Sequence, residues 1–508
     1  MYYPSLEQVK KMARRGNLVP IYREVLADLE TPVSAYLKVA DGPYSFLLES
    51  VEGGERVARY SFIGANAQKV IRTGVKGSSA AKPARQGKVF TYGKLDPLIT
   101  IERELARYKP VTVDGLPRFH GGMVGYLAYE SVGYFEKLPS PAADALGLPE
   151  SVFMLADTLI VFDHVKHKMK IVGHVHINGD VNKAYKEAVA RIEAVVQKLD
   201  KPVERLTRAA KPLPPGKVTS NMTEAQHART VKRGKEHIVA GDIIQVVLSQ
   251  RLARKTKAHP FDIYRALRNV NPSPYMFYLD LDDFHLVGAS PEMLVRVEGR
   301  AVATNPIAGT RRRGKDEAED KALAEELLAD KKERAEHIML VDLGRNDIGR
   351  VSKPGTVVVD QLMDIERFSH VMHIVSRVSG TLKDGMTSYD ALRACFPAGT
   401  LSGAPKIRAM EIIADLEPSK RGMYGGAVGY FDFSGNMDTC IGLRAMVVKN
   451  GTAYVQAGGG IVYDSDPKAE YQETLHKAAA QLRAIDEAEA LEQVVSDSGR
   501  GARKAVAR

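Results

Sequence analysis

Tryptophan is absent from the 508-residue chain, and cysteine occurs only twice, at Cys395 and Cys440. The missing tryptophan removes the indole ring as a core, interface or stacking group anywhere in the protein. The two cysteines stand far apart and form no CxxC pair, which excludes a disulfide scaffold and disfavours a metal-thiolate or redox site. We therefore expect the protein in a reducing cytoplasm.

Long apolar segments are also missing. No stretch reaches the roughly 20 apolar residues that a transmembrane helix needs. Residues 1–26 alternate basic and apolar side chains and lack the uninterrupted apolar core of a secretory signal. The sequence therefore predicts no association with a membrane.

The charge balance is basic, because 72 lysines and arginines outnumber 62 aspartates and glutamates to give a net charge of +10. Such an excess is compatible with a nucleic-acid partner or with an acidic small substrate. Basic and acidic residues are interleaved over most of the chain, and the densest basic run, residues 311–313, is followed directly by an acidic segment. No helix-turn-helix, zinc-finger or RNP-like pattern is present. We therefore expect no nucleic-acid partner and favour the acidic substrate.

A proline- and glycine-rich segment at residues 211–226 divides the chain. It predicts an N-terminal domain over 1–210, a C-terminal domain over 218–490, and a basic, disordered tail over 491–508. Thr219 or Ser220 is expected to lead into a helix that runs to about Ala240.

Short strand-like runs recur in both halves, and two long helical patterns stand out at Glu317–Leu343 and Pro467–Val494. The strand-like runs lie at 44–50, 60–64, 158–165, 243–249, 275–281, 284–289, 294–297 and 357–359. Many strands mixed with separate helices predict an α+β fold, with mainly antiparallel sheets forming a sandwich and helices flanking it. The GGMVGY sequence at 121–126 has an echo in GGAVGY at 425–430, which is compatible with two similar strand starts.

Two pairs of glutamates have helical spacing: Glu333 with Glu336, and Glu470 with Glu473. Side chains three apart share one face of a helix. If the two helices met, their carboxylates would suit a divalent cation with oxygen ligands such as Mg²⁺. Each pair by itself reads as a solvated helix face, because basic residues adjoin both, including Lys477 at i+4 from Glu473.

Glycine-rich segments at 398–406 and 456–464 predict flexible turns whose N–H groups can bind an anion or simply close a tight turn. Arg444 is expected within a strand, flanked by small residues that leave room for a bidentate carboxylate, unless it is an edge-strand surface residue. His373 is a lone histidine in a strand-like run, and taken alone it is more typical of a hydrogen-bonded structural residue than of a catalytic one.

Residues 240–480 resemble the chorismate-utilising enzyme family, and within it the members that form anthranilate. The resemblance rests on sequence blocks that occur in order along the chain: NPSPYMFYL (271–279), GASPEMLVR (288–296), PIAGTRRRG (306–314), ERAEHIMLVDLGRND (333–347), GTLSGAPK (399–406), YGGAVGYF (424–431), DTCIGLR (438–444) and QAGGGIVYDSDPKAEYQET from 456. LLES (47–50) and RYSFIG (59–64) extend it into the N-terminal half. The resemblance implies a Mg²⁺-dependent lyase acting on chorismate.

The resemblance also assigns residues to that chemistry. Glu336 and Glu473 would bind Mg²⁺ with help from Glu333 and Glu470. Chorismate would contact Gly309, Thr310, Tyr424, Arg444, Gly458, Gly459 and Gly460. Glu292 would be the general acid, His373 would assist pyruvate loss, and Thr400 would position the substrate.

Two positions distinguish this chain from relatives with other products. Gln245 stands where isochorismate- and salicylate-forming relatives carry a water-activating lysine, and glutamine cannot act as a base. Ala308 stands where aminodeoxychorismate-forming relatives typically carry a nucleophilic lysine, and alanine cannot perform covalent catalysis. The resemblance therefore favours anthranilate formation. The alternatives are aminodeoxychorismate formation and a catalytically inactive, nucleic-acid-binding relative.

A partner and an inhibitor are implied as well. The chain has no GxCxG nucleophile, so we expect a separate glutamine amidotransferase subunit that supplies ammonia within a hetero-oligomer. The resemblance further implies feedback inhibition by L-tryptophan at a site formed by Glu49, Ser50, Pro274, Tyr275 and Met276. A plain strand contact between the two halves is the simpler interpretation of those residues.

Overall fold

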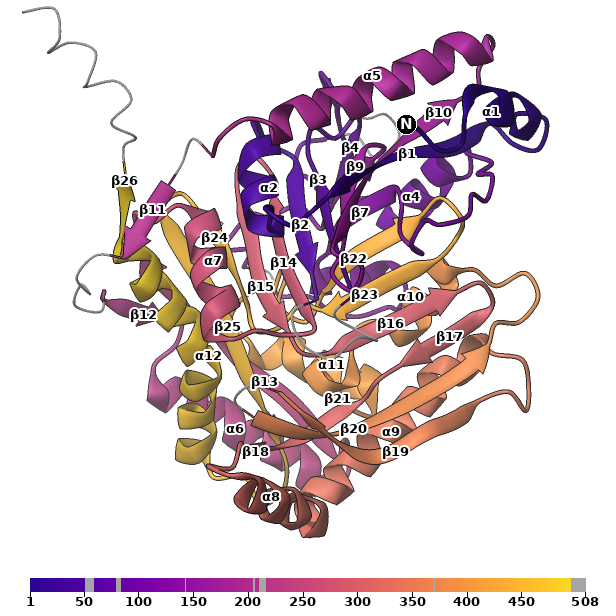
Figure 1. The fold of residues 1–508 in the computed structure, drawn as a ribbon. Helices are drawn as coiled ribbons and strands as arrows, with labels where there is room; N and C mark the ends of the chain where they lie inside the picture. The colour runs from indigo at the N-terminus through magenta and orange to yellow at the C-terminus, as the bar shows by residue number, and fades with distance from the viewer. Residues whose placement is uncertain are drawn as a thin grey trace, which may run out of the picture.

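The computed structural model describes residues 1–50, 59–78, 84–141, 143–203, 206–209, 216–368 and 371–494. Over these ranges the chain forms two twelve-stranded sheets and one two-stranded ribbon, with helices on the outer faces of the sheets (Figure 1). Among their pairings only β4 with β6 is parallel. The predicted α+β class with mainly antiparallel sheets is confirmed.

The first sheet contains strands from both halves of the chain. Its order is β1 (Leu18–Leu26), β10 (Lys168–His176), β9 (Leu159–Asp163), β3 (Tyr60–Gly64), β2 (Ser45–Glu49), β14 (Tyr275–Asp280), β15 (His285–Ser290), β24 (Ala445–Lys449), β25 (Thr452–Ile461), β13 (Gln245–Lys255) and β12 (Val218–Ser220), with β21 (Gly403–Ala404) beside β13.

The second sheet is also shared between the halves. Its order is β18 (Ile307–Arg312), β20 (Val371–Thr381), β17 (Ala301–Thr304), β16 (Met293–Glu298), β23 (Met437–Ile441), β22 (Ala427–Asp432), β7 (Gly122–Leu127), β8 (Ser151–Ala156), β4 (Val70–Thr73), β6 (Val89–Thr91) and β5 (Ala84–Gln86), with β19 (Val358–Arg367) beside β20.

The three largest of the five apolar clusters in the described ranges form layers of the sandwich. The layer between the sheets contains strand residues such as Phe62, Tyr126 and Phe277. The outer face of the first sheet packs on α1 (Leu6–Met12), α2 (Pro32–Val39), α5 (Val181–Leu199), α7 (Pro260–Val270) and α12 (Pro467–Glu489). The outer face of the second sheet packs on α4 (Pro97–Leu105), α9 (Lys331–Val351) and α10 (Ser388–Cys395). Burial of these faces provides the main driving force for folding.

The two halves of the chain are joined through both sheets. β2 pairs with β14, and β7 pairs with β22. The echoed glycine sequences form the second of these pairs, with Gly125 directly opposite Gly429. The division into two domains at 211–217 remains a prediction. Strands from both sides of it belong to the same two sheets.

Three predicted element boundaries are wrong. The helix expected over 317–343 is two helices, α8 (Glu317–Ala329) and α9, because Asp330 between them is extended and accepts hydrogen bonds from the N–H groups of Lys332 and Glu333 as the N-cap of α9. The helix expected to start after Ser220 is α6 (Glu224–Val239), with Thr223 and Gln226 forming a capping box.

The third boundary lies near the C-terminus. α12 ends at Glu489, and Leu491–Val494 forms β26 against β11 (Leu206–Ala209). The predicted tail therefore begins as a strand, and residues 495–508 lie outside the described residues. Of the helices in the described ranges, none combines the length and the apolarity needed to cross a membrane.

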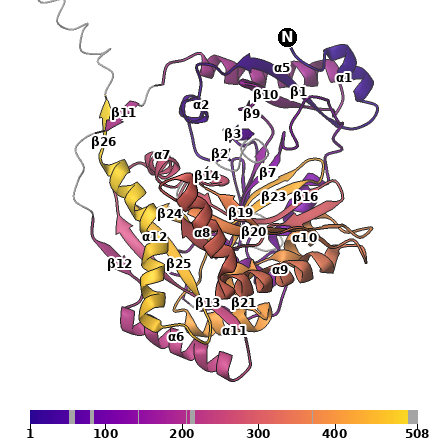
Figure 2. The same cartoon turned by 60° about the horizontal axis from the view of Figure 1, so that its bottom comes forward.

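Figure 2 shows α6, α8, α9, α12 and α11 (Lys406–Leu416) gathered at one end of the molecule. β13 and β25 run into this end beside one another, in a register that pairs Val247 with Gly460 and Ser249 with Gly458. Of the two helices that carry the four predicted metal-binding glutamates, α12 packs on the glycine-rich strand, and α9 contacts Gln245 at the start of β13.

Candidate active site

Glu470 of the α12 pair lies beside β25, and Glu336 of the α9 pair is linked to that strand through Gln245. Glu336 on α9 accepts a hydrogen bond from Nε2 of Gln245 at 3.2 Å. A Cβ added to Gly460 would lie 2.2 Å from that Nε2, and one added to Gly459 would lie 2.6 Å from Oε2 of Glu470 on α12. Two adjacent glycines thus separate the α9 carboxylates from the α12 carboxylates.

The predicted turn at Gly458–Gly460 is wrong, because all three glycines lie within β25. Glycine is needed at these positions for lack of space and not for the flexibility of a turn. A Cβ at Gly458 would lie 2.9 Å from Oη of Tyr424, and the neighbouring positions would meet Gln245 and Glu470. The glycines make room for side chains that converge on the strand.

Two of the four carboxylates have a cationic partner, Arg311 for Glu333 and Lys477 for Glu473. Burial and the charge of Glu336 raise the pKa of Glu333, and burial raises the pKa of Glu470, with a further contribution from Glu473. Oε2 of Glu470 is buried without a hydrogen-bond partner. Within the described ranges no three histidine, cysteine, aspartate or glutamate side chains are already close enough together to hold a metal ion. The unpartnered oxygen and the raised pKa values fit a divalent cation that would draw the two pairs together.

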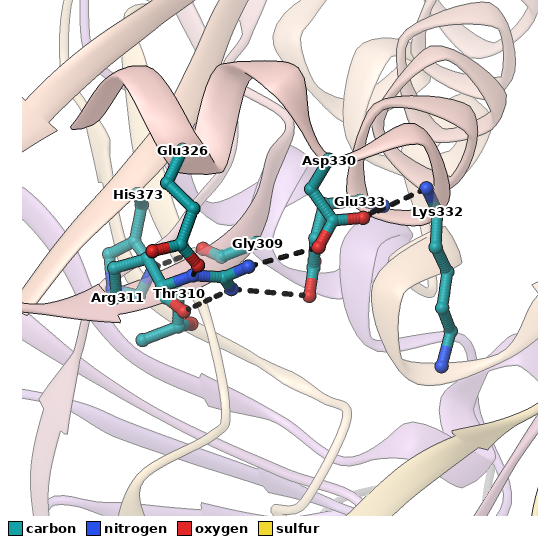
Figure 3. A network of polar contacts seen from close by, with 8 residues as sticks. All are labelled: Gly309, Thr310, Arg311, Glu326, Asp330, Lys332, Glu333 and His373. Carbon is teal, nitrogen blue, oxygen red and sulfur yellow. Dashed lines mark hydrogen bonds and ion pairs between the residues drawn. The ribbon is translucent and has the colours of Figure 1, made fainter. Parts of the chain in front are cut away.

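One arginine links the start of α9 to the strand before it. Figure 3 shows Arg311 between Glu326 on one side and Asp330 and Glu333 on the other. Its Nε lies 3.0 Å from Glu326, its Nη2 2.9 Å from Asp330, and its Nη1 3.8 Å from Glu333. The next two arginines pair with Glu319 and Asp320 of α8. Each arginine of the densest basic run therefore has an acidic partner within the protein.

His373 lies on β20 against a bulge in β18. The bulge places Gly309 at a φ of +70°, a conformation that favours glycine. Nδ1 of His373 lies 2.8 Å from the carbonyl oxygen of Gly309 and 3.2 Å from the hydroxyl of Thr310 (Figure 3). Donation to the carbonyl assigns the proton to Nδ1 and leaves Nε2 as the basic nitrogen. Burial lowers the pKa of His373, and the charge of Arg444 lowers it further.

The alternating pattern predicted Arg444 within a strand, and this prediction is wrong. Arg444 occupies the connection between β23 and β24 with a φ of +50°, a strained conformation for arginine. Its Nη1 donates to the carbonyl oxygen of Lys477 at 2.5 Å. Burial lowers the pKa of Arg444, while Tyr424 and Glu473 raise it because both lie close to the guanidinium. The strained turn thus points the guanidinium at the same group of residues.

Glu292 lies in the short connection between β15 and β16. Its side chain borders a small cavity of about 40 Å³ with Thr400. Burial raises the pKa of Glu292 to about 8, against smaller lowering effects from the Thr400 hydroxyl and the backbone of Ile307. Ile307 is two residues before Gly309, so Glu292 lies next to the segment that carries the predicted substrate contacts. A carboxyl of this kind is protonated at neutral pH and can donate a proton.

A family model described as chorismate binding enzyme matches residues 45–483. The chain belongs to this family.

Anthranilate synthase component 1 of Acetivibrio thermocellus is 49% identical over 96% of this chain and 99% of that protein. The crystal structure of anthranilate synthase component I from Streptococcus pneumoniae TIGR4 superimposes with a TM-score of 0.75 and 37% identity, over 90% of this chain and 99% of that one. The menaquinone-specific isochorismate synthase of Escherichia coli, at 19% identity and a TM-score of 0.69 over 94% of this chain and 98% of that chain, shares the fold.

Two groups of the site were missed from the sequence. Lys477 appeared only as a helical partner of Glu473, but its Nζ also donates to the carbonyl oxygen of Gly458 at 3.0 Å. Arg421 carried no recognisable pattern, yet it is 2% exposed and forms a buried pair with Glu417 beneath Tyr424. Only the i+4 spacing of Glu473 and Lys477 offered a signal in the sequence.

A second cavity, of about 530 Å³, lies between the two sheets at the junction of the two halves. Its lining includes all five residues of the predicted inhibitor site: Glu49, Ser50, Pro274, Tyr275 and Met276. The register of β2 and β14 places Glu49 opposite Met276. The hydroxyl of Ser50 is buried without a partner, whereas Glu49 accepts hydrogen bonds from Tyr264 and Arg268. The five residues of the predicted inhibitor site therefore line one cavity.

Proposed function

We propose that this chain converts chorismate and ammonia to anthranilate, pyruvate and water, as the chorismate-binding component of an anthranilate synthase. The observation that carries the proposal is Glu292, a buried carboxyl with a pKa of about 8 that borders the Gly309 segment. Loss of the 4-hydroxyl of chorismate needs a proton donor, because hydroxide is a poor leaving group. The names of the relatives, anthranilate synthase component 1, support the same activity.

The residues divide the work between binding and proton transfer. Arg444 and Tyr424 would hold the enolpyruvyl carboxylate, since a buried guanidinium binds a carboxylate strongly. Glu292 would protonate the departing 4-hydroxyl as ammonia adds at C2. Gln245 cannot deprotonate a water molecule, which favours ammonia over water as the nucleophile. Nε2 of His373 would take the C2 proton as the C3–O bond breaks and releases the enolate of pyruvate, which takes a proton at its methylene carbon to give pyruvate.

We infer that the four glutamates form a Mg²⁺ site, with Glu336 and Glu473 as direct ligands and Glu333 and Glu470 acting through water. The unpartnered oxygen of Glu470 supports this. Bound Mg²⁺ would neutralise the ring carboxylate of chorismate. Lys477 pairs with Glu473, and its ammonium would have to release that carboxylate for Glu473 to bind Mg²⁺ directly.

We infer further that ammonia comes from a separate glutamine amidotransferase subunit. Cys395 and Cys440 are both buried, and burial raises the pKa of each thiol far above its ordinary value. A buried, protonated thiol cannot attack glutamine. The number in the relatives' name, component 1, supports an assembly with another component.

The purified chain tests the proposal directly. Incubation with chorismate, Mg²⁺ and an ammonium salt is expected to give fluorescent anthranilate, and glutamine alone is expected to give none. Formation of aminodeoxychorismate instead, identified by mass and absorbance of the product, would contradict the assignment and the argument from Ala308. Turnover with glutamine in the absence of any partner would contradict the separate subunit.

We propose that the 530 Å³ cavity binds L-tryptophan as a feedback inhibitor. The aromatic and apolar residues of its lining suit an indole ring, while its charged residues and the unpartnered Ser50 hydroxyl are available to the polar groups of the ligand. Tryptophan is expected to inhibit anthranilate formation by the purified chain and to raise its thermal unfolding midpoint.

A further inference from the structure

Glu130 connects the N-terminal half of the chain to a loop of the active site. It lies in the short helix η1 (Tyr129–Tyr134), directly after β7. Its two carboxylate oxygens accept hydrogen bonds from successive backbone N–H groups, those of Arg421 at 2.6 Å and Gly422 at 3.0 Å. The N–H of Tyr129 donates in return to the carbonyl oxygen of Gly422 at 2.7 Å. Three hydrogen bonds thus fix the backbone at 421–422.

The side chain of Arg421 carries this restraint into the active site. Its Nη1 donates to the carbonyl oxygen of Leu401 at 2.6 Å, and its Nη2 donates to that of Val247 at 2.8 Å. Leu401 follows Thr400, and Val247 lies two residues after Gln245 on β13. The guanidinium also packs over the ring of Tyr129 at 4.8 Å from its centre. One buried arginine therefore sets the relative positions of two segments of the site.

The chain that continues from Gly422 supplies the proposed substrate contact Tyr424. The Tyr424 ring lies 5.5 Å from the Arg421 guanidinium, and its hydroxyl approaches Gly458. The N–H of Gly425 donates to the carbonyl oxygen of Gly442, two residues before Arg444. A shift of the 421–425 segment would therefore move both groups assigned to the enolpyruvyl carboxylate.

We propose that Glu130 is a positioning residue for chorismate: it touches no substrate, but its carboxylate holds the 421–425 segment so that Tyr424 and Arg444 meet the ligand. This inference rests on the proposed function. A carboxylate that accepts from two successive N–H groups cannot be replaced by an amide, because one end of an amide only donates. Glu130→Gln would leave one N–H of the loop facing another donor and loosen the segment.

Steady-state kinetics with ammonia and saturating Mg²⁺ test the proposal on the full chain. Glu130→Gln is expected to raise the KM for chorismate about tenfold while kcat changes less than about threefold, since the loss falls on binding rather than on proton transfer. Glu130→Asp, which keeps the charge on a shorter side chain, is expected to give a smaller rise. Glu150→Gln is the matched control, because Glu150 lies near η1 and contacts the hydroxyl of Tyr134 but not the 421–425 segment. It should retain the wild-type KM.

The outcomes separate the inference from the function. If the wild-type chain forms anthranilate and Glu130→Gln retains the wild-type KM, the positioning role is wrong and the function stands. A lower thermal unfolding midpoint without a rise in KM, or equal rises in Glu130→Gln and Glu150→Gln, would also overturn it, because either result indicates a structural role only. If Glu130→Gln fails to fold, the Glu130→Asp variant decides by the same KM comparison. Absence of anthranilate with the wild-type chain would instead overturn the proposed function.

Discussion

The hydroxyl of Thr400 lies against the carboxyl of Glu292 at the edge of a cavity of about 40 Å³. A space of this size has room for water. Glu292 is 8% exposed, and burial is the main cause of its raised pKa. Glu292 therefore keeps its proton at neutral pH, at which the four glutamates of α9 and α12 would bind a cation.

The pH dependence of activity should report this proton. The acid form of Glu292 dominates below its pKa of about 8 and is lost above it. We therefore expect kcat/KM for chorismate to fall as the pH rises through about 8, because this ratio reports the free enzyme. Glu292→Gln should lower kcat by about 10²- to 10⁴-fold and remove that limb of the profile. A variant that retains both the rate and the alkaline limb would show that another group supplies the proton.

Replacement of a proposed direct metal ligand should weaken Mg²⁺ binding whether or not turnover occurs. For Glu336→Gln and Glu473→Gln we expect calorimetric Mg²⁺ affinity to fall at least tenfold, because each loses an anionic oxygen ligand. Glu325→Gln provides a control, since this exposed carboxylate of α8 faces Lys321 and is not among the four glutamates. An equal loss in the control, or unchanged affinity in the two ligand variants, would contradict the assignment.

The sequence predicted the fold class and the helices that carry the four glutamates correctly. It predicted the backbone conformation at Arg444 and at the three glycines incorrectly. Helical spacing correctly placed Glu333 with Glu336 and Glu470 with Glu473 on helices, since i and i+3 positions share a face wherever the helix packs. Arg444 was misplaced in a strand because alternation cannot detect a single residue with positive φ. The prediction of a turn at the three glycines is wrong. These positions lack side chains because Tyr424, Glu470 and Gln245 approach the strand there, and local sequence cannot show such tertiary contacts.

Other parts of the site had no signal of their own in the chain. Glu130 and Arg421 lie 291 positions apart, and nothing in local composition shows that one caps the backbone of the other. The resemblance to a family supplied residue roles, but roles that act through a second residue depend on contacts across the two sheets. Such contacts become visible only when β7 and β22 are seen paired.

Packing at Gly459 offers a test of how closely β25 is fitted to the carboxylates. A methyl group added by Gly459→Ala would lie 2.6 Å from Oε2 of Glu470, so that side chain has to move. We expect a stable protein, because the end of a side chain yields more readily than backbone, but a several-fold loss of Mg²⁺ affinity. Gly349→Ala is the control, since an added methyl there meets nothing within 4 Å and helix interiors favour alanine by about 1 kcal/mol. Unchanged affinity in Gly459→Ala would place Glu470 outside the metal site.

Feedback inhibition should depend on Ser50 and not on the chemistry of the active site. Ser50 lines the 530 Å³ cavity with a buried, unpartnered hydroxyl, so Ser50→Phe would fill part of the space proposed for tryptophan. We expect the concentration of tryptophan that halves activity to rise at least tenfold, while kcat and the KM for chorismate without inhibitor stay within about twofold. Ser140→Phe provides a control, because Ser140 is exposed and does not line the cavity. Full inhibition of Ser50→Phe by tryptophan at wild-type concentrations would show that the inhibitor binds elsewhere. Loss of activity in Ser50→Phe without tryptophan would show that this wall of the cavity supports catalysis.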